Sequence, residues 1–336
     1  MRSKFFFFLL IPLFCTFTLQ AQTRVSGYKI SRVIHLTGNG GWDYLSVDVA
    51  NSKLFVSHGT QVNVADLNKG EELAVIPNTS GVHGIAIAND LNKAFISCGR
   101  DTSVKVVDLN NFKEMARIRV TGQNPDAILY DQYSHKVFTF NGRSSNSTVI
   151  DAKDNKVIGT IQLSGKPEFP QTDGKGKIYV NIEDKSTIAL INAKTLKVEK
   201  EWSIAPGEEP SGLALDQTNN RLFSVCGNKM MVVSDPVSGK VITTVPIGDG
   251  CDGVAFDPDK KRIYSSNGEG TMTVIQQESA DKYSVVENMP TKQGARTITI
   301  NKNTHRIYLS VADRVAGQER AYKPDTFTVI EVEPIK

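Results

Sequence analysis

Polar residues that could bind or transform a ligand recur along the chain at intervals of about 42 residues. The first set holds four carboxylates, a histidine, a serine and an arginine: Asp43, His83, Asp126, Glu168, Ser211, Asp252 and Arg296. A second set follows each of these at a nearly constant spacing: His58, Cys98, Asn141, Glu183, Cys226, Asn267 and Ala312. Core positions in a repeat would carry Val, Ile or Leu. Convergent polar side chains instead predict a binding site, provided that the fold brings the two sets together.

The residue types favour a cation as one ligand. Carboxylate oxygens suit a hard divalent ion such as calcium, and adding His58 and His83 allows zinc. The metal ligands that we expect are Asp126, Glu168, Glu183 and Asp252. Arg296 would either face a substrate carboxylate or form an internal ion pair with Asp43. The predicted ligand-binding set comprises Asp43, His58, His83, Asp126, Asn141, Glu168, Glu183, Asp252, Asn267 and Arg296.

The elements that must position these residues are short strands. Seven units begin near residues 42, 82, 125, 167, 210, 251 and 295. Each starts with a segment such as WDYLSVD or CDGVAFD, continues with one such as KLFVSHG or RIYLSVA, and adds a third and, in most units, a fourth apolar run. Turn residues separate these runs, and long helical periodicity is absent, so they predict antiparallel hairpins.

A four-stranded sheet with two apolar faces cannot bury both alone, whereas radial packing against neighbouring sheets can. We therefore predict an all-β, seven-bladed β-propeller with four antiparallel strands per blade. The seventh unit ends after its third strand, at TFTVIEVEPIK, and residues 27–37 resemble the fourth strand that it lacks. We expect this N-terminal strand to close the ring. Residues 23–336 would then form one domain.

The first residues read MRSKFFFFLLIPLFCTFTLQAQ, with a basic start, an apolar stretch and small or polar residues after it. This pattern predicts a signal peptide over residues 1–22 and an exported protein, periplasmic or secreted, in a bacterium. It is too short and wrongly flanked for a membrane span. Its removal takes Arg2 and Lys4 from a formal net charge of +3. The nearly neutral mature chain, which we expect to be a monomer, has no long-range attraction for nucleic acid or anionic lipid.

Three cysteines remain after the leader: Cys98, Cys226 and Cys251. An odd number in an oxidising compartment implies at least one free thiol or an external partner. The repeat register places Cys226 and Cys251 on adjoining units at the same end of the sheets. Either a Cys226–Cys251 disulfide or two buried free thiols fits this placement.

The chain resembles the YVTN-repeat β-propellers, and specifically the YncE-like periplasmic proteins. The resemblance covers the mature chain and depends on KIYVNIE (177–183), on RLFSVCG and RIYLSVA, and on unit starts such as PDAILYD. The tetrad that names the repeat is degenerate here, as Tyr179, Val180 and Asn181. The resemblance implies an exported seven-bladed propeller. One member of the group is associated with single-stranded DNA, and related propellers include metal-dependent lactonases and a lyase.

Three functions follow from these observations. The first is a non-catalytic binding or scaffold protein whose acidic mouth takes a small molecule, a metal ion or a protein. The second is a metal-dependent hydrolase or lyase in which His83, Asp126 or Glu168 transfers the proton. The third is single-stranded DNA binding, which needs a basic groove with aromatic residues and is disfavoured by an acidic mouth. Arg100 and Arg143, on loops after second strands, keep it open. We favour the binding protein.

Overall fold

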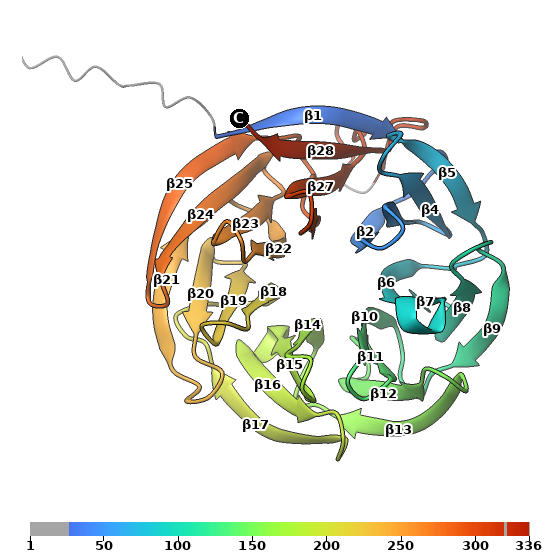
Figure 1. The fold of residues 1–336 in the computed structure, drawn as a ribbon, viewed down its shortest axis with the longest axis horizontal. Coiled ribbons are helices and arrows are strands. Elements are labelled where there is room, and N and C mark those ends of the chain that lie inside the picture. Colours follow the sequence, from blue (N-terminus) through green and yellow to red (C-terminus); the bar gives the residue numbers. More distant parts are fainter. Residues whose placement is uncertain (1–26, 319–320, 336) are drawn as a thin grey trace, which may run out of the picture.

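Residues 27–318 and 321–335 are described by a computed structural model, in which they form a closed ring of seven four-stranded antiparallel sheets (Figure 1). The predicted all-β, seven-bladed propeller is thereby confirmed. The predicted signal peptide, residues 1–22, lies outside the described residues. Two short 3-10 helices, η1 (Asn89–Leu91) and η2 (Glu183–Lys185), interrupt the strands. Within the described ranges, none of the helices has the length and apolar character needed to span a bilayer.

Six blades use four consecutive strands, ordered from the axis outward. The first contains β2 (Trp42–Asp48), β3 (Lys53–His58), β4 (Gln61–Asp66) and β5 (Glu71–Ile76). The second contains β6 (Val82–Ala88), β7 (Lys93–Cys98), β8 (Ser103–Asp108) and β9 (Glu114–Arg119). The third contains β10 (Pro125–Asp131), β11 (Lys136–Asn141), β12 (Asn146–Asp151) and β13 (Lys156–Gln162).

The next three blades repeat this order. The fourth contains β14 (Pro167–Thr172), β15 (Lys177–Ile182), β16 (Thr187–Asn192) and β17 (Lys197–Ser203). The fifth contains β18 (Pro210–Asp216), β19 (Arg221–Cys226), β20 (Met230–Ser234) and β21 (Val241–Pro246). The sixth contains β22 (Cys251–Asp257), β23 (Arg262–Asn267), β24 (Thr271–Ser279) and β25 (Lys282–Pro290).

The seventh blade joins the two ends of the chain. It contains β26 (Ile298–Asn301), β27 (Arg306–Val311), β28 (Thr328–Pro334) and, outermost, β1 (Tyr28–His35). Strand β1 pairs antiparallel with β28, and the two lie side by side at the rim of the ring in Figure 1. The predicted closure by an N-terminal strand is therefore confirmed, and it removes the open edge that a broken ring would present.

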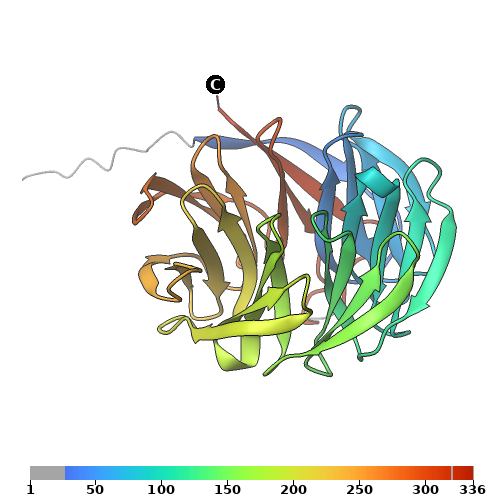
Figure 2. The same ribbon diagram turned by 60° about the horizontal axis from the view of Figure 1, so that its bottom comes forward.

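The core lies between neighbouring blades. In each blade, the second strand from the axis carries an aromatic residue at its third position. Each of these side chains is at most 4% exposed: Phe55, Phe95, Phe138, Tyr179, Phe223, Tyr264 and Tyr308. Phe55 packs with Val82 and Ile85 of the next blade, and Phe138 packs with Ile178. Burial of both faces of every sheet stabilises the ring through the hydrophobic effect. The strands run from one face of the ring to the other, so the hairpin loops lie on two opposite faces (Figure 2).

Candidate functional site

A recurring β-bulge aims the first predicted set of side chains at the axis. In β2, Trp42 lies opposite His58 and Leu45 lies opposite Val56, so Asp43 and Tyr44 share one partner position. The backbone N–H of Asp43 donates to Ser57 Oγ there, at 2.9 Å. The register shifts at the same place in the other five complete blades. A bulge turns a side chain away from the regular alternation of a strand, and here it turns the second residue of each inner strand toward the channel.

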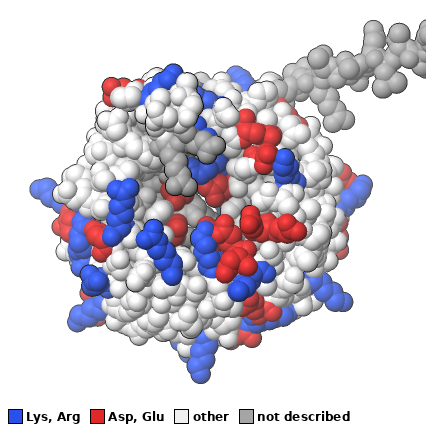
Figure 3. Space-filling model, turned by 180° about the vertical axis from the view of Figure 1, so that it is seen from behind, with Lys and Arg blue, Asp and Glu red and all other residues white. Residues whose placement is uncertain are grey.

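These residues meet in a cavity of about 190 Å³ at one end of the channel, which we call the mouth. Its lining residues are Asp43, Tyr44, Asp126, Lys166, Glu168, Glu183, Ser211, Asp252 and Arg296. Acidic side chains gather around the central opening on the face of the ring seen in Figure 3. His83 lies beside the cavity, with its Nδ1 atom 2.6 Å from Asp43 Oδ2 and 3.5 Å from Asp126 Oδ1.

Tyr44 contributes an aromatic side chain at the base of the mouth. It is 8% exposed, and its hydroxyl lies 3.4 Å from Glu168 Oε2 on the fourth blade. Its ring packs edge-on against that of Phe169, with the ring centroids 5.2 Å apart. Burial, together with the charge of Glu168 and other carboxylates, raises the pKa of Tyr44 well above its ordinary value. The phenol therefore remains a neutral hydrogen-bond donor to Glu168.

Three cations lie among the carboxylates of the mouth, and each has a partner. His83 bonds Asp43, and Lys166 contacts both Glu183 and Glu168, the latter at 2.8 Å. Arg296 Nε donates to Asp252 Oδ2 at 2.7 Å. The expected internal ion pair of Arg296 thus forms, but with Asp252 instead of Asp43. The reason is the direction of the guanidinium, which donates to Asp252 and also to the carbonyl of Trp42 at 3.1 Å.

Five carboxylates face these three cations, so the mouth holds two acids in excess. Pairing His83 with Asp43, Lys166 with Glu183 and Arg296 with Asp252 leaves Asp126 and Glu168, whose side chains are 15% and 10% exposed. Burial, together with the charge of Asp43, raises the pKa of Asp126 to about 7. Burial and the charge of Asp126 raise the pKa of Glu168 to about 8. Asp126 and Glu168, whose negative charges are least compensated by cations, therefore have the most strongly raised pKa values among the carboxyls of the mouth. This is expected for buried carboxyls that interact with each other.

The other ionisable groups of the mouth are shifted less or in the opposite sense. Burial raises the pKa of Asp252 to about 6, although Arg296 opposes the shift. Burial alone would lower the pKa of His83, but its hydrogen bond to Asp43 and the charge of Asp126 raise it to about 9. His83 is therefore an imidazolium at neutral pH and forms part of the cation set.

Of the second predicted set, only Glu183 reaches the mouth. His58 is 1% exposed, stacks on Phe327 at a ring distance of 3.9 Å, and bonds Asn63. Burial lowers its pKa, which keeps the ring neutral. Asn141 bonds Asn146 and Thr148, and Asn267 bonds Thr271 and Thr273. The expectation that His58, Asn141 and Asn267 face the mouth is therefore wrong, because their side chains are hydrogen-bonded to neighbours within the blades.

The four predicted metal ligands do not form one group, because they contact three different cationic side chains. Glu168 and Glu183 contact Lys166, and Asp252 contacts Arg296, which leaves Asp126 with His83. The donor atoms of Asp43, His83 and Asp126 lie within 4.8 Å of one another and could hold a metal ion. A second such group, Asp257, Asp259 and His305, lies at the opposite end of the inner strands. There Asp257 accepts the backbone N–H groups of Asp259 and Lys260, so its carboxylate already caps a turn.

Sequence reasoning missed two residues of the mouth. Tyr44 follows the first predicted set by one position, where the seven units read Tyr44, Gly84, Ala127, Phe169, Gly212, Gly253 and Thr297. The two aromatic residues of this series, Tyr44 and Phe169, are the two that pack against each other in the structure. Their size at a position where the other units have smaller residues could have indicated that they belong to the mouth. Lys166 precedes an inner strand where four of the other six units have glycine, at Gly41, Gly81, Gly250 and Gly294. A lysine at that position marks a departure from the repeat.

Of the two alternatives for Cys226 and Cys251, the structure shows the second, because all three cysteines in the described residues are buried free thiols. Cys251 Sγ lies 3.1 Å from the carbonyl oxygen of Cys226, and Cys226 Sγ lies 3.6 Å from that of Ser224. Each thiol is thus directed at a backbone acceptor. Burial raises the pKa of both thiols to about 12, which suppresses the reactive thiolate.

We therefore expect Cys98, Cys226 and Cys251 to resist alkylation in the native protein and to react fully after unfolding without reductant. Mass spectrometry of iodoacetamide-treated peptides checks this. Cys226 and Cys251 peptides that stay linked until a reductant is added would contradict the assignment of free thiols.

The ring and its charged mouth define a seven-bladed β-propeller with an acidic cavity at one end of its axis. The chain is similar to antigen Lp49 of Leptospira interrogans, with 25% identity over 220 residues that cover 61% of this chain and 48% of Lp49. It is also similar to the protein YncE of Salmonella typhimurium, with 22% identity over 237 residues that cover 70% of this chain and 55% of YncE. YncE of Salmonella typhi is 26% identical over 152 residues, or 45% of this chain and 39% of that protein.

The chain thus matches between 39% and 55% of the length of these relatives. No family model matches it. Solved structures share the fold across nearly the whole ring. Hydrazine synthase from Kuenenia stuttgartiensis has a TM-score of 0.72 at 17% identity, covering 88% of this chain and 97% of that one. U3-55K has a TM-score of 0.77 at 10% identity, covering 92% and 98%. The similarity to YncE and the seven-bladed ring together confirm the YncE-like resemblance.

Proposed function

We propose that the protein is an exported, non-catalytic binding module whose mouth takes a small cation. The observation that carries the proposal is the charge balance of the mouth, where five carboxylates face three cations in a cavity of about 190 Å³. A buried carboxylate whose charge is not fully compensated is costly, and such groups bind a proton or another cation in compensation. Asp126 and Glu168 are the two acids that a ligand would neutralise.

The donors favour a hard cation or an ammonium group over zinc. Asp43, Asp126 and Glu168 offer carboxylate oxygens, which calcium prefers. His83 Nδ1 is engaged by Asp43 at 2.6 Å and its pKa is raised, so a metal would have to displace a proton to use this nitrogen. Calcium would be held through the oxygens of Asp126 and its neighbours, and an ammonium group would bond the same oxygens.

A metal-dependent hydrolase is the second candidate, because the donor atoms of Asp43, His83 and Asp126 converge within 4.8 Å. In that case Glu168, with its raised pKa, would be the group suited to hold and deliver a proton near neutral pH. Metal analysis followed by an assay on lactones, with and without chelator, distinguishes the two functions. Turnover that the chelator abolishes would favour the hydrolase.

Addition of a cation is expected to raise the melting temperature of the protein at pH 8. Calcium chloride is the probe for a metal ion, and 1,4-diaminobutane is the probe for an organic cation. Sodium chloride at equal ionic strength is the control. A ligand that binds only the folded state stabilises it by about 2.7 kcal/mol at one hundred times its dissociation constant. If neither probe changes the melting temperature beyond the salt control, the proposal is wrong.

The same titration is expected to depend on pH in one direction. The cation competes with the protons of Asp126 and Glu168, whose pKa values are raised to about 7 and about 8. Affinity should therefore rise as the pH increases from 6 to 9, by roughly tenfold or more, with release of protons on binding. Isothermal titration calorimetry in buffers of different ionisation enthalpy measures both quantities. Affinity that is constant over this range would assign binding to other groups.

A further inference from the structure

Lys166 places its ammonium group inside the mouth, between two of the five carboxylates. Its Nζ atom lies 2.8 Å from Glu168 Oε1 and also contacts a carboxylate oxygen of Glu183. Glu168 belongs to the inner strand of the fourth blade, and Glu183 follows the second strand of that blade. Glu168 is also one of the two excess acids, together with Asp126. A ligand that approaches Glu168 therefore meets a cation that already belongs to the protein.

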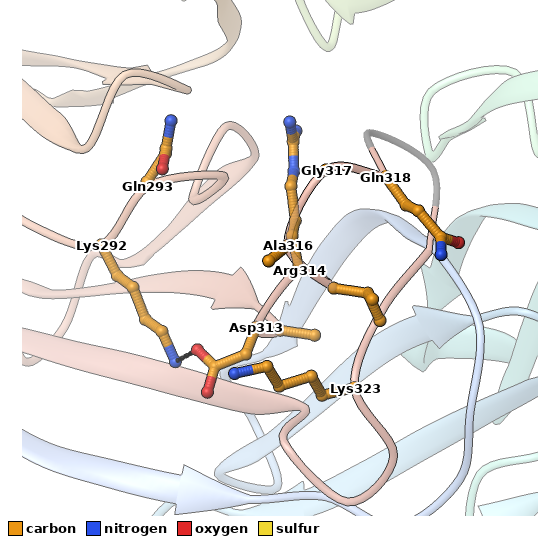
Figure 4. Close-up of a pocket in the computed structure, with 10 residues that line it drawn as sticks. Lys292, Gln293, Asp313, Arg314, Ala316, Gly317, Gln318 and Lys323 are labelled. Atoms are coloured by element: carbon orange, nitrogen blue, oxygen red, sulfur yellow. Dashed lines mark ion pairs between the residues drawn. The ribbon is translucent and has the colours of Figure 1, made fainter.

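Two other lysine ion pairs on this face of the ring provide a comparison. Lys229 pairs with Asp249 at 3.0 Å, and Lys292 pairs with Asp313 at 2.6 Å (Figure 4). None of these four residues lines the mouth. Lys166 differs in two respects, since it contacts two carboxylates and both of them line the cavity.

The main chain of Lys166 is held in place, whereas its side chain has room to move. The backbone N–H of Lys166 donates to Asp184 Oδ1 at 2.7 Å, and its carbonyl oxygen accepts the backbone N–H of Glu183 at 2.9 Å. The side chain is 42% exposed, so a large part of it already lies in solvent. The flexible lysine stem permits the ammonium group to turn outward. Lys166 is therefore an attached cation that a ligand can displace without unpacking the ring.

An attached ammonium group sets a threshold for any cation that would replace it. Because the lysine cannot diffuse away, it competes for Glu168 at an effective concentration on the order of millimolar. A monovalent cation brings no more charge than the lysine it would displace, so the exchange gains little electrostatic energy. A divalent cation brings one charge more, and this additional charge compensates Asp126. The attached lysine therefore excludes monovalent cations and admits divalent ones.

We propose that Lys166 is an internal counter-ion of the mouth, which occupies part of the cation site and withdraws from Glu168 when a divalent ligand binds. This inference rests on the proposed cation binding, and it narrows the ligand to an ion with two positive charges, either a divalent metal ion or a diammonium compound. Such a ligand raises the number of positive charges in the mouth from three to five, equal to the number of carboxylates.

Calorimetric titration at pH 8 tests this with 1,4-diaminobutane and 1-aminobutane, which share a carbon chain but differ by one ammonium group. Wild-type protein should bind the diamine and show no measurable affinity for the monoamine. Lys166→Met with Glu183→Gln removes the internal cation and one acid together, so the excess of two acids is unchanged. This double variant should bind the diamine at least about tenfold more tightly and should also bind the monoamine. Calcium chloride, titrated separately, distinguishes a metal ion from an organic cation as the preferred ligand.

The matched control is Lys229→Met with Asp249→Asn, which removes a lysine and its carboxylate partner from the same face of the ring. It should leave the affinity for both amines unchanged. Melting temperatures verify that the variants are folded. Lys166→Gln alone, which should also bind the diamine more tightly than wild type, is a second variant of the mouth.

The outcomes separate this inference from the proposed function. If wild-type protein binds calcium or the diamine and the double variant binds them no more tightly, Lys166 is not a counter-ion of the site, and the cation proposal stands. If only the double variant binds these probes, occupancy of the site by Lys166 is supported, and the cation proposal is wrong for the wild type. If neither protein binds any probe, both are wrong. Equal affinity of the wild type for the two amines would overturn the requirement for two charges.

Discussion

Replacement of Asp126 by Asn together with Glu168 by Gln is expected to stabilise the protein at pH 8 and to abolish cation binding. The change removes the two excess acids and leaves His83 with Asp43, Lys166 with Glu183 and Arg296 with Asp252. The amides keep the size of the side chains they replace, so packing changes little. Each of these acids shares its cation with a second carboxylate, so its burial is only partly compensated and costs stability, and neutral isosteres avoid that cost.

The stabilisation should appear only at the higher pH. Asp126 and Glu168 have pKa values raised from about 4 to about 7 and 8, so the folded state retains protons that the unfolded state has released. Stability of the wild type therefore falls as the pH rises from about 4 to about 8, whereas the variant lacks both titrations. At pH 4 the two proteins should melt together. At pH 8 the variant should be more stable by on the order of 3 kcal/mol.

A contrasting variant makes this prediction sharper. Asp252→Asn is the same chemical change at the equivalent position of the sixth blade, but it removes the partner that accepts from Arg296 at 2.7 Å. A partly buried guanidinium that loses its carboxylate partner is destabilising, so this variant should melt lower than wild type at pH 8. Thermal denaturation at pH 4, 6 and 8 provides the comparison. A lower melting temperature for both variants would assign Asp126 and Glu168 a structural role.

The proposed cation binding gives the two excess acids a use that offsets their cost to stability. Substitution by Asn or Gln would be simple and, by the argument above, stabilising. Residues that lower stability without a packing role are commonly those that function requires. The three compensated pairs position the site, and the excess pair is the part available to a ligand.

The architecture could be predicted from the sequence because it repeats. Each unit brings its own turns and an aromatic residue in its second strand, so one alignment positions every blade. Closure by residues 27–37 followed from a seventh unit that lacks its last strand. The position of the inner acids followed for the same reason, since the bulge that aims Asp43 recurs in β6, β10, β14, β18 and β22.

The rest depended on local conformation that the repeat does not determine. His58, Asn141 and Asn267 occupy equivalent positions, yet the hydrogen bonds they make within their blades decide where they point. The thiols of Cys226 and Cys251 likewise point at backbone carbonyl oxygens and form no disulfide.

The closing strand offers the second large effect, because two isoleucines on β1 have opposite environments. Ile34 is fully buried and lies opposite Val329 of β28, whereas Ile30 is 44% exposed and lies opposite Val332. A shift in register between Ile30 and Arg32 inverts the alternation of the strand, which explains why residues four apart do not share a face. The pair is thus a matched test of how strongly β1 closes the ring.

Ile34→Ala is expected to lower the free energy of unfolding by about 2–5 kcal/mol, as for large-to-small changes in a well-packed core. Ile30→Ala, the control, should cost less than about 1 kcal/mol, because the three carbon atoms that it removes belong to a side chain that is largely exposed. Urea denaturation measures both, and hydrogen exchange should show faster exchange of β28 amides in Ile34→Ala alone. Equal, small losses in the two variants would mean that the ring does not depend on β1, since the cavity left at Ile34 would then cost the closed propeller nothing.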